Sequence, residues 1–458
     1  MTNTSSKEHI KENKMGSMNI NRLILTMSAP IVISMMVQSL YNVVDSIFVA
    51  QISEEAITAV SMAFPFQQLM MSVGIGTAIG VNSFLARSLG AKEFSRVNKI
   101  ANNGLLLAFL SFIAFFMMGL LLSDKLITIQ TDNQEIISHG PVYLRICLMG
   151  SLGIFTHLMF ERLLQATGKT MYTMIAQISG ALMNIILDPI MIFGWFGMPA
   201  MGLAGAALAT VISQYVGALV VAYLCIRKEK DIDIGFRYMK PDFKIIRDIY
   251  AVGIPSIIMI SISSVTIFSM NQILAKFSIT AVALLGIYFK LQSFIFMPVF
   301  GLNNGIIPIV AYNYGAGNKE RMRETIFLGM RYAVTIMLIG TLIMMVFPDK
   351  LLGMFNASDQ MLVIGRVAFR IIATSFAFAA ISIISIGVFQ AIGKGTLSMM
   401  ISIIRQLVVL VPLAYLFSLT GNLDRVWWCV IIAELVAVSI CVRNISCLLY
   451  TSDAADEE

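Results

Sequence analysis

Charged side chains are scarce in this sequence. Asp, Glu, Lys and Arg make up only 13% of its 458 residues, whereas 58% are hydrophobic and the mean hydropathy is +0.83. Because soluble proteins carry about 25% charged residues, this composition excludes a soluble globular protein. Several nearly uncharged stretches run for about 20 residues, the length of helix that crosses the hydrocarbon core of a bilayer. These stretches are expected to be helices, because a backbone in lipid must satisfy its hydrogen bonds within its own segment.

Histidine and cysteine are also scarce, and their spacing excludes the common catalytic and metal sites. The chain has three histidines and five cysteines, and the cysteines are scattered through apolar segments without a CxxC motif. Neither a zinc site nor a catalytic triad can be assembled from them. No nucleophile–base pair is apparent either. We therefore expect a protein that is not an enzyme, needs no cofactor and keeps its cysteines as free thiols packed among apolar side chains.

The chain repeats itself at a nearly fixed spacing. Four short motifs recur: Ala29-Pro30 as Ile254-Pro255, Gly90-Ala91 as Gly315-Ala316, Gln165–Lys169 as Gln390–Lys394, and Leu187–Pro189 as Leu410–Pro412. The interval is identical in the first three pairs (255 − 30, 315 − 90 and 390 − 165) and slightly shorter in the last (410 − 187). A repeat of this size in a membrane protein is typical of transporters, whose binding sites lie near the middle of the bilayer between or within the repeats.

The hydropathy pattern predicts twelve transmembrane helices, six in each repeat. The predicted spans are 23–50, 57–87, 100–122, 136–163, 170–193, 202–226, 246–275, 280–311, 325–347, 362–391, 396–417 and 426–443. Six is an even number, so both halves enter the membrane from the same side. The predicted fold is therefore an all-α integral membrane protein with two parallel six-helix repeats around a central cavity. Its expected parts are an N-terminal tail (1–22), an N-lobe (23–227), a linker (228–244), a C-lobe (245–443) and a C-terminal tail (444–458).

The distribution of lysine and arginine predicts the orientation in the membrane. With the N-terminus inside, the inside segments hold 22 of the 32 basic residues, whereas the outside loops hold four, namely Lys125, Lys276, Lys350 and Arg425. Basic residues collect on the cytoplasmic side of membrane proteins. We therefore expect a multi-pass protein of the bacterial cytoplasmic membrane with both termini and the linker in the cytoplasm. The net charge of +6 reflects this orientation and does not indicate nucleic-acid binding.

Two aspartates lie inside predicted spans, where a charge is costly and is by default a candidate functional group. Asp45 is in the first span and Asp188 in the fifth, where Asn184 lies four residues earlier on the same helix face and Pro189 follows directly. A carboxyl group withdrawn from water holds a proton more readily, as a proton-coupled carrier requires. A sodium ion could use the same oxygen atoms. The alternative is a buried acid that pairs with an embedded base for packing or topology.

Other embedded charges are divided between the two halves. Glu161 lies at the inner end of the fourth span beside Arg162, where either a local salt bridge or attraction of a cation in the cavity could explain it. Lys290 and Arg405 lie in the second half, together with Glu434. At the repeat spacing, Asp45 and Asp188 align with Met270 and Val411, so the second half lacks both acids.

These motifs together resemble the multidrug and toxic compound extrusion (MATE) transporters, and within them the MepA-type bacterial branch. The resemblance covers about residues 20 to 443. It rests on Ala29-Pro30, Tyr41–Asp45, Gly90–Lys92, Gln165–Lys169, Asn184–Pro189 and Gly205–Thr210, which occur in this order along the doubled six-span frame. Some members also carry acidic residues in spans seven and eight; here span seven has none beyond Asp248 in its first turn, and span eight carries Lys290, so coupling is expected to rest on the first lobe.

The resemblance implies a secondary antiporter that exports organic cations in exchange for protons or sodium ions. Its cation-coupling cluster would be Asp45, Asn184, Asp188 and Thr210, which could also hold Na⁺. The expected substrate-binding residues are Glu161, Tyr41 and Gln38. A monomer embedded in the bilayer is expected. The acidic end, Asp453–Glu458, resembles nothing in the family, and an artefact of sequence assembly is one explanation of residues 444–458.

Two other function classes fit the residues less well. A flippase for lipid-linked sugars would share the two-lobe architecture and favour basic residues such as Lys290 and Arg405, but Asp45 and Asp188 would oppose an anion. A channel is disfavoured because no repeated ring of pore-lining charge appears. The sequence does not decide between proton and sodium coupling, and it does not name the exported compounds.

Overall fold

Long apolar helices account for nearly all of the chain in the computed structural model, which describes residues 13–235, 240–355 and 358–454. Eleven helices are long and apolar enough to cross a membrane, and one further pair, Asp359–Ala373 with Phe376–Ala391, is bent by 47° and makes a twelfth span. The all-α fold with twelve spans is thereby confirmed.

The elements follow the repeat. The first half holds α1 (Lys14–Ser17), α2 (Ile20–Ala50), α3 (Glu54–Gly90), α4 (Phe94–Thr128), α5 (Gln134–Met149), α6 (Leu152–Ala166), α7 (Thr170–Phe193), η1 (Trp195–Gly197) and α8 (Gly202–Lys228). The second half holds α9 (Phe243–Ala275), α10 (Ile279–Gly315), α11 (Lys319–Val346), α12 (Pro348–Gly353), α13 (Asp359–Ala373), α14 (Phe376–Ala391), α15 (Gly395–Ile403), η3 (Ile404–Leu410), α16 (Val411–Ser418) and α17 (Leu423–Ala454).

Equivalent residues begin equivalent helices in the two halves. The Ser53 side chain accepts a hydrogen bond from the Ala56 amide at the start of α3, and Ser278 accepts one from Ala281 at the start of α10. A serine at this position satisfies an amide that has no partner within the helix. The interval between the two serines (278 − 53) equals that between the repeated motifs (315 − 90).

Two predicted spans are each broken into two helices. Span 136–163 consists of α5 and α6, which meet at Gly150, and span 362–391 consists of α13 and α14, which meet at Thr374. A Cβ atom added at Gly150 would lie 2.7 Å from Val211 Cγ2, so the chain passes very close to α8 at this break. At the other end of the chain, α17 continues past residue 443 to Ala454, because Ile445 and Leu448 extend its apolar sequence.

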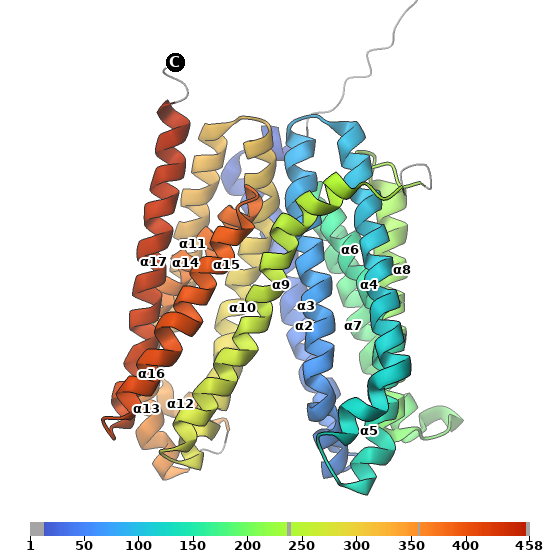
Figure 1. Cartoon of the computed structure of the whole chain (residues 1–458), viewed down its shortest axis with the longest axis vertical. Coiled ribbons are helices and arrows are strands. Elements are labelled where there is room, and N and C mark those ends of the chain that lie inside the picture. The colour runs from blue at the N-terminus through green and yellow to red at the C-terminus, as the bar shows by residue number, and fades with distance from the viewer. Residues whose placement is uncertain (1–12, 236–239, 356–357, 455–458) are drawn as a thin grey trace, which may run out of the picture.

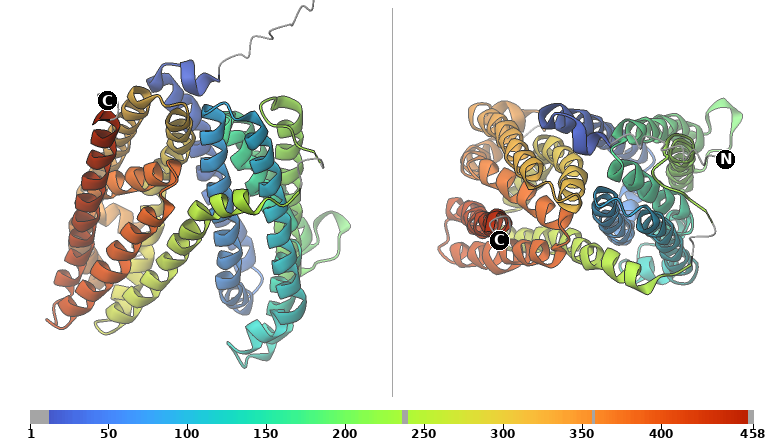
Figure 2. Two further views of the ribbon diagram at one scale, coloured as in Figure 1. Left: turned by 45° about the horizontal axis from the view of Figure 1, so that its top comes forward. Right: turned by 90° about the horizontal axis from the view of Figure 1, so that it is seen from above.

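The helices form two lobes that meet at one end of the molecule. Figure 1 shows α2–α8 in one group and α10–α17 in the other, with α9 crossing between them, and Figure 2 shows the same two groups from above. We call the end that carries α1, residues 229–235 and residues 240–242 the linker end. From there the ribbons of α3 and α10 diverge toward the opposite end (Figure 1).

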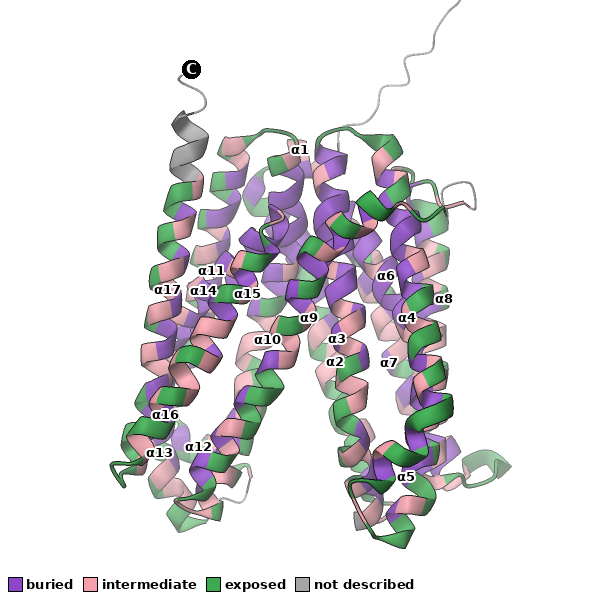
Figure 3. Ribbon diagram, in the orientation of Figure 1, coloured by how far each residue is buried: buried purple, intermediate pink, exposed green. Residues whose placement is uncertain are grey.

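Glycines allow the two lobes to meet at the linker end. A Cβ atom added at Gly90 would overlap the carbonyl oxygen of Tyr312, and one added at Gly315 would overlap that of Arg87. Hydrogen bonds join the lobes in the same region: Ser83 Oγ donates to the Gln390 carbonyl oxygen over 2.6 Å. Buried residues are concentrated toward this end (Figure 3). The lobes therefore contact one another closely at the linker end, and their helices diverge toward the other end (Figure 1).

The short helix α1 packs across the linker end. Met15 is fully buried, and its carbonyl oxygen accepts hydrogen bonds from Asn313 Nδ2 and Arg321 Nη2, both over 3.2 Å. Lys14 lies on the N-lobe side, where burial and the nearby positive charge of Lys169 lower its pKa below the ordinary value. Residues 13–18 thus contact both lobes.

Candidate functional site

Asp188 and Asn184 lie on one face of α7, as their spacing predicts. Asp188 is fully buried, Asn184 is nearly so, and Asn184 Nδ2 donates a hydrogen bond to Asp188 Oδ1 over 3.2 Å. Helix α7 remains helical through Pro189 and is followed by Gly194, which has a left-handed backbone with φ of +77°. Glycine adopts this conformation without strain, so it is suited to ending the helix here. The helix holds the amide and the acid together in the interior of the N-lobe.

The structure brings Asp45 of α2 to Asp188 of α7. The two carboxyl groups lie close enough to interact with one another, and both lie near the hydroxyl of Tyr41. Tyr41 and Asp45 are four residues apart, so they share a face of α2. The two acids are far apart in the sequence, and only packing of α2 against α7 joins them in one site.

Three oxygen atoms of this site are buried and have no hydrogen-bond donor in the described residues. They are Asp45 Oδ1, Asn184 Oδ1 and Asp188 Oδ2. A buried oxygen without a donor is destabilising. A proton shared between the carboxyl groups would supply one donor, and a hard cation such as sodium prefers carboxylate and amide oxygens as ligands. The donor set therefore fits either a proton or a sodium ion.

Two predicted residues lie at the margin of this site. Thr210 of α8 is partly buried. Helices α7 and α8 approach one another closely where Gly205 meets Met191 and where Gly180 meets Ser213. Thr210 lies between these two contacts, near the depth of Asn184 on α7. Gln38 is half-buried on α2, one turn toward the linker end from Tyr41. Neither side chain hydrogen-bonds to the two acids within the described residues. Their assignment to the site stays a prediction.

Glu161 belongs to a separate network that reaches the C-lobe. Gln165 Nε2 donates to Glu161 Oε1 over 2.8 Å, and Arg162 Nη1 donates to Gln165 Oε1 over 2.9 Å. The same Arg162 nitrogen lies 3.2 Å from Asn304 Oδ1 of α10. Gln165 thus connects the acid and the base that the sequence places side by side. No motif marks Asn304 in the sequence, and no sequence spacing connects it to Arg162.

The second half contains an ion pair in place of an acid pair. Arg405 Nη1 lies 3.0 Å from Glu434 Oε1, and the two side chains are 21% and 12% exposed. Arg405 lies in a π-helical segment, Ile404–Leu410, that precedes Pro412. In the sequence, this pair is indicated by a basic residue in span 396–417 and an acidic residue in the next span, 426–443. Arg405 is therefore neutralised, unlike Lys290, which forms no ion pair in the described residues.

This pair predicts a specific pattern of stabilities. We expect Glu434→Gln to lower the free energy of unfolding by about 3 kcal/mol, because it leaves a guanidinium that is only partly exposed without its counter-ion. The double variant Arg405→Met/Glu434→Leu should recover most of that loss, because it removes both charges. Thermal unfolding of the parent protein and both variants in detergent measures the effect. A double variant that is less stable than Glu434→Gln would contradict this account.

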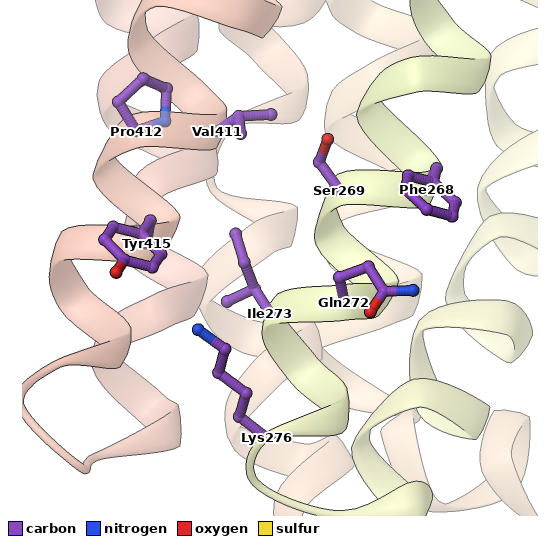
Figure 4. Close-up of a pocket in the computed structure, with 8 residues that line it drawn as sticks. All are labelled: Phe268, Ser269, Gln272, Ile273, Lys276, Val411, Pro412 and Tyr415. Atoms are coloured by element: carbon purple, nitrogen blue, oxygen red, sulfur yellow. The ribbon is translucent and has the colours of Figure 1, made fainter.

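A groove on the C-lobe lies away from the acid pair. Residues of α9 and α16 line it on the C-lobe, with Lys276 and Tyr415 at one end (Figure 4). Lys276 Nζ lies 4.8 Å from the centroid of the Tyr415 ring. None of the predicted site residues lines this groove, so it is not the candidate site.

In a comparison with known protein families, the same family model matches both halves of the chain. The profile of the MatE family matches residues 30–190 and again residues 255–416. The starting points of the two matches (255 − 30) differ by the interval of the repeated motifs. Together they cover more than half of the chain.

Related proteins are similar along nearly the whole chain. The multidrug export protein MepA of Staphylococcus haemolyticus (strain JCSC1435) is 26% identical over 419 residues, which cover 91% of each chain. A solved MOP superfamily transporter from Pyrococcus furiosus superposes with a TM-score of 0.89 at 26% identity, covering 97% of this chain and 99% of its own. An outward-facing multidrug resistance MATE family transporter superposes with a TM-score of 0.90 at 25% identity and the same coverage.

Proposed function

Because the chain belongs to the MatE family of membrane transporters, we propose that it is a secondary multidrug efflux antiporter that exports organic cations in exchange for protons or sodium ions. The observation that carries this proposal is the pairing of partly buried Asp45 with fully buried Asp188, each with an oxygen that has no hydrogen-bond donor in the described residues. Such a pair can exist with or without a bound cation, and coupled exchange requires both states. The relatives' name, multidrug export protein, supports the choice of drugs as cargo.

The arrangement of the lobes supports a cycle of alternating access. The lobes are closed at the linker end, so the proposed route by which a cation reaches the acid pair starts at the opposite end. Neutralising the acids would remove their attraction for a cationic drug and favour its release on that side. Reopening at the linker end requires Gly90 and Gly315 to separate from the opposite lobe. Glu161 and Tyr41 are the proposed contacts of the drug, with Gln38 beside them.

The proposed orientation places the linker end in the cytoplasm. The chain is a multi-pass membrane protein, and its linker, both described termini and most basic residues lie at this end (Figure 1). Positive charge favours the cytoplasmic side. With this orientation the lobes are open to the outside of a bacterial cell, which is the state that follows drug release. We propose that the protein acts as a monomer in the cytoplasmic membrane.

A lipid-linked sugar flippase is less well supported. Its phosphate group would need unpaired basic residues along the path, and Glu434 neutralises Arg405. Of Lys290 and Arg405, Lys290 is the one without an ion pair in the described residues, and the acid pair in the opposite lobe would repel a phosphate.

Transport in vesicles tests the proposed function. Purified protein in liposomes loaded with ethidium should release the dye faster when a proton or a sodium gradient is imposed separately across the membrane. Liposomes with the same protein but no gradient are the control. Release that is equally fast with and without both gradients would contradict antiport.

Drug and coupling cation should compete for the acid pair. Drug affinity in detergent should fall as the pH drops or as sodium rises, because both neutralise the acids that attract the drug. Because linkage is reciprocal, bound drug should weaken binding of the cation by the same factor as the cation weakens binding of the drug. That factor is about 5–150 for a coupling free energy of about 1–3 kcal/mol. Asp188→Asn should still bind drug but lose this dependence, whereas Asp132→Asn, in an exposed loop, is the control and should keep it. Drug affinity that ignores both pH and sodium in the unmodified protein would refute the competition.

A further inference from the structure

Helix α11 carries a second groove, which is of mixed charge and lies apart from the candidate site. Its lining consists of two acids, two arginines and two apolar side chains, namely Glu320, Arg323, Glu324, Phe327, Leu328 and Arg331. Arg323 Cζ lies 5.8 Å from the centroid of the Phe327 ring. Arg331 and Glu324 are both exposed, and neither forms an ion pair in the described residues.

The side of α11 that bears Arg331 faces away from the N-lobe. Gly340 follows Arg331 by nine residues (340 − 331), or two and a half turns, so the two lie on opposite sides of the helix. A Cβ atom added at Gly340 would overlap the side chain of Ile295 on α10, whose glycines approach the N-lobe. On the side of Arg331 the helix continues with Leu338 and Leu342, which are 52% and 62% exposed. In a membrane-spanning chain, such exposed apolar side chains face lipid.

The guanidinium of Arg331 lies near the level of lipid phosphates. Arg331 precedes the end of α11 at Val346 by 15 residues (346 − 331). That length of helix is about 22 Å, less than the hydrocarbon core of about 30 Å, so the backbone at Arg331 lies within the core. Helical side chains lean toward the N-terminus of their helix, which for α11 is the linker end. A long arginine side chain can therefore place its charge among the headgroups of the leaflet at that end.

The two acids lie beyond Arg331, toward the linker end. Glu324 precedes Arg331 by seven residues (331 − 324), nearly two turns, so it lies on the same face and about 10 Å nearer the water. Glu320 lies one turn farther (324 − 320), and carboxylates at this spacing repel one another. The charges of the groove cancel, so a lipid with a net negative charge gains no overall attraction. A headgroup with phosphate at Arg331 and a cation at Glu324 meets an opposite charge at both levels.

We propose that this groove binds a phospholipid whose phosphate carries a primary ammonium, as in phosphatidylethanolamine. The phosphate accepts hydrogen bonds from Arg331, a geometry to which guanidinium is suited. The ammonium donates to Glu324, which a quaternary ammonium cannot do and a glycerol headgroup cannot match in charge. The acyl chains follow Leu338 and Leu342 into the core, so the occupant is a lipid and not a soluble phosphate ester.

A reporter beside the groove tests this preference in bilayers. Thr335 is exposed one turn beyond Arg331, and Cys447 is the one exposed cysteine of the described residues. Thr335→Cys in a Cys447→Ser background can therefore be labelled with bimane and placed in phosphatidylcholine bilayers. Phospholipids with brominated acyl chains quench the label when they occupy the groove. We expect the ethanolamine lipid to bind about threefold more tightly than the choline or glycerol lipid, the strength of an exposed ion pair.

Matched variants assign the preference to the two charges. Glu324→Gln should bind the ethanolamine and choline lipids equally, and Arg331→Gln should lose all discrimination among the three lipids. Asp359→Asn, an exposed acid of the same lobe at the opposite end, should keep the preference. A label at Leu219→Cys, a 69% exposed position on α8, should be quenched equally by all three lipids.

Three results would overturn the proposal: equal quenching at Thr335→Cys by all three lipids, stronger quenching by the glycerol lipid, or an unchanged preference in Glu324→Gln. The second result would identify a site for anionic lipid instead. The assay uses neither a drug nor an ion gradient, so its outcome is independent of the proposed antiport.

Discussion

Asp188→Asn should abolish gradient-driven efflux and leave a folded protein in the membrane. An asparagine has nearly the same shape but cannot gain and lose a proton or attract a cation by charge. Asp45→Asn should behave similarly, because the two acids form one site. Ethidium efflux from vesicles, at matched protein levels, measures the loss. Normal efflux by either variant would show that the pair does not act as a unit.

Gly315→Ala should prevent the lobes from closing at the linker end. Its Cβ would overlap the carbonyl oxygen of Arg87, and a backbone atom cannot rotate away as a side chain can. Overpacking of this kind costs about 1–3 kcal/mol, which shifts the balance between the closed and open linker end by a factor of about 5–150. We expect a large loss of efflux. A cysteine placed at buried Ser28, in a background with Cys447→Ser, should become reactive toward a soluble thiol reagent.

A second glycine of the same helix provides the control. Nothing lies within 4 Å of a Cβ added at Gly286, so Gly286→Ala should leave both efflux and the reactivity of the Ser28→Cys reporter unchanged. If Gly315→Ala left the reporter as protected as in the parent protein, the close approach would have no part in closing this end.

The sequence by itself determined the twelve spans, the repeat and the residues of each helix that bear charge. Lipid forces each segment to satisfy its backbone hydrogen bonds locally, so hydropathy along the chain is enough to locate the helices. The breaks at Gly150 and Thr374 were not predicted, because both flanking helices are apolar and only contact with neighbouring helices shows where the chain bends.

The tertiary structure decided which of these residues meet. Asp45 and Asp188 were each predicted as functional, and Arg405 and Glu434 were each noted, but their pairing depends on how helices of equal hydropathy pack. Apolar faces pack on one another in many arrangements of similar energy, and close approaches such as Gly90 to Tyr312 select one of them. The link from Arg162 to Asn304 and the closed linker end follow from that selection, because both depend on contacts between residues far apart in the chain.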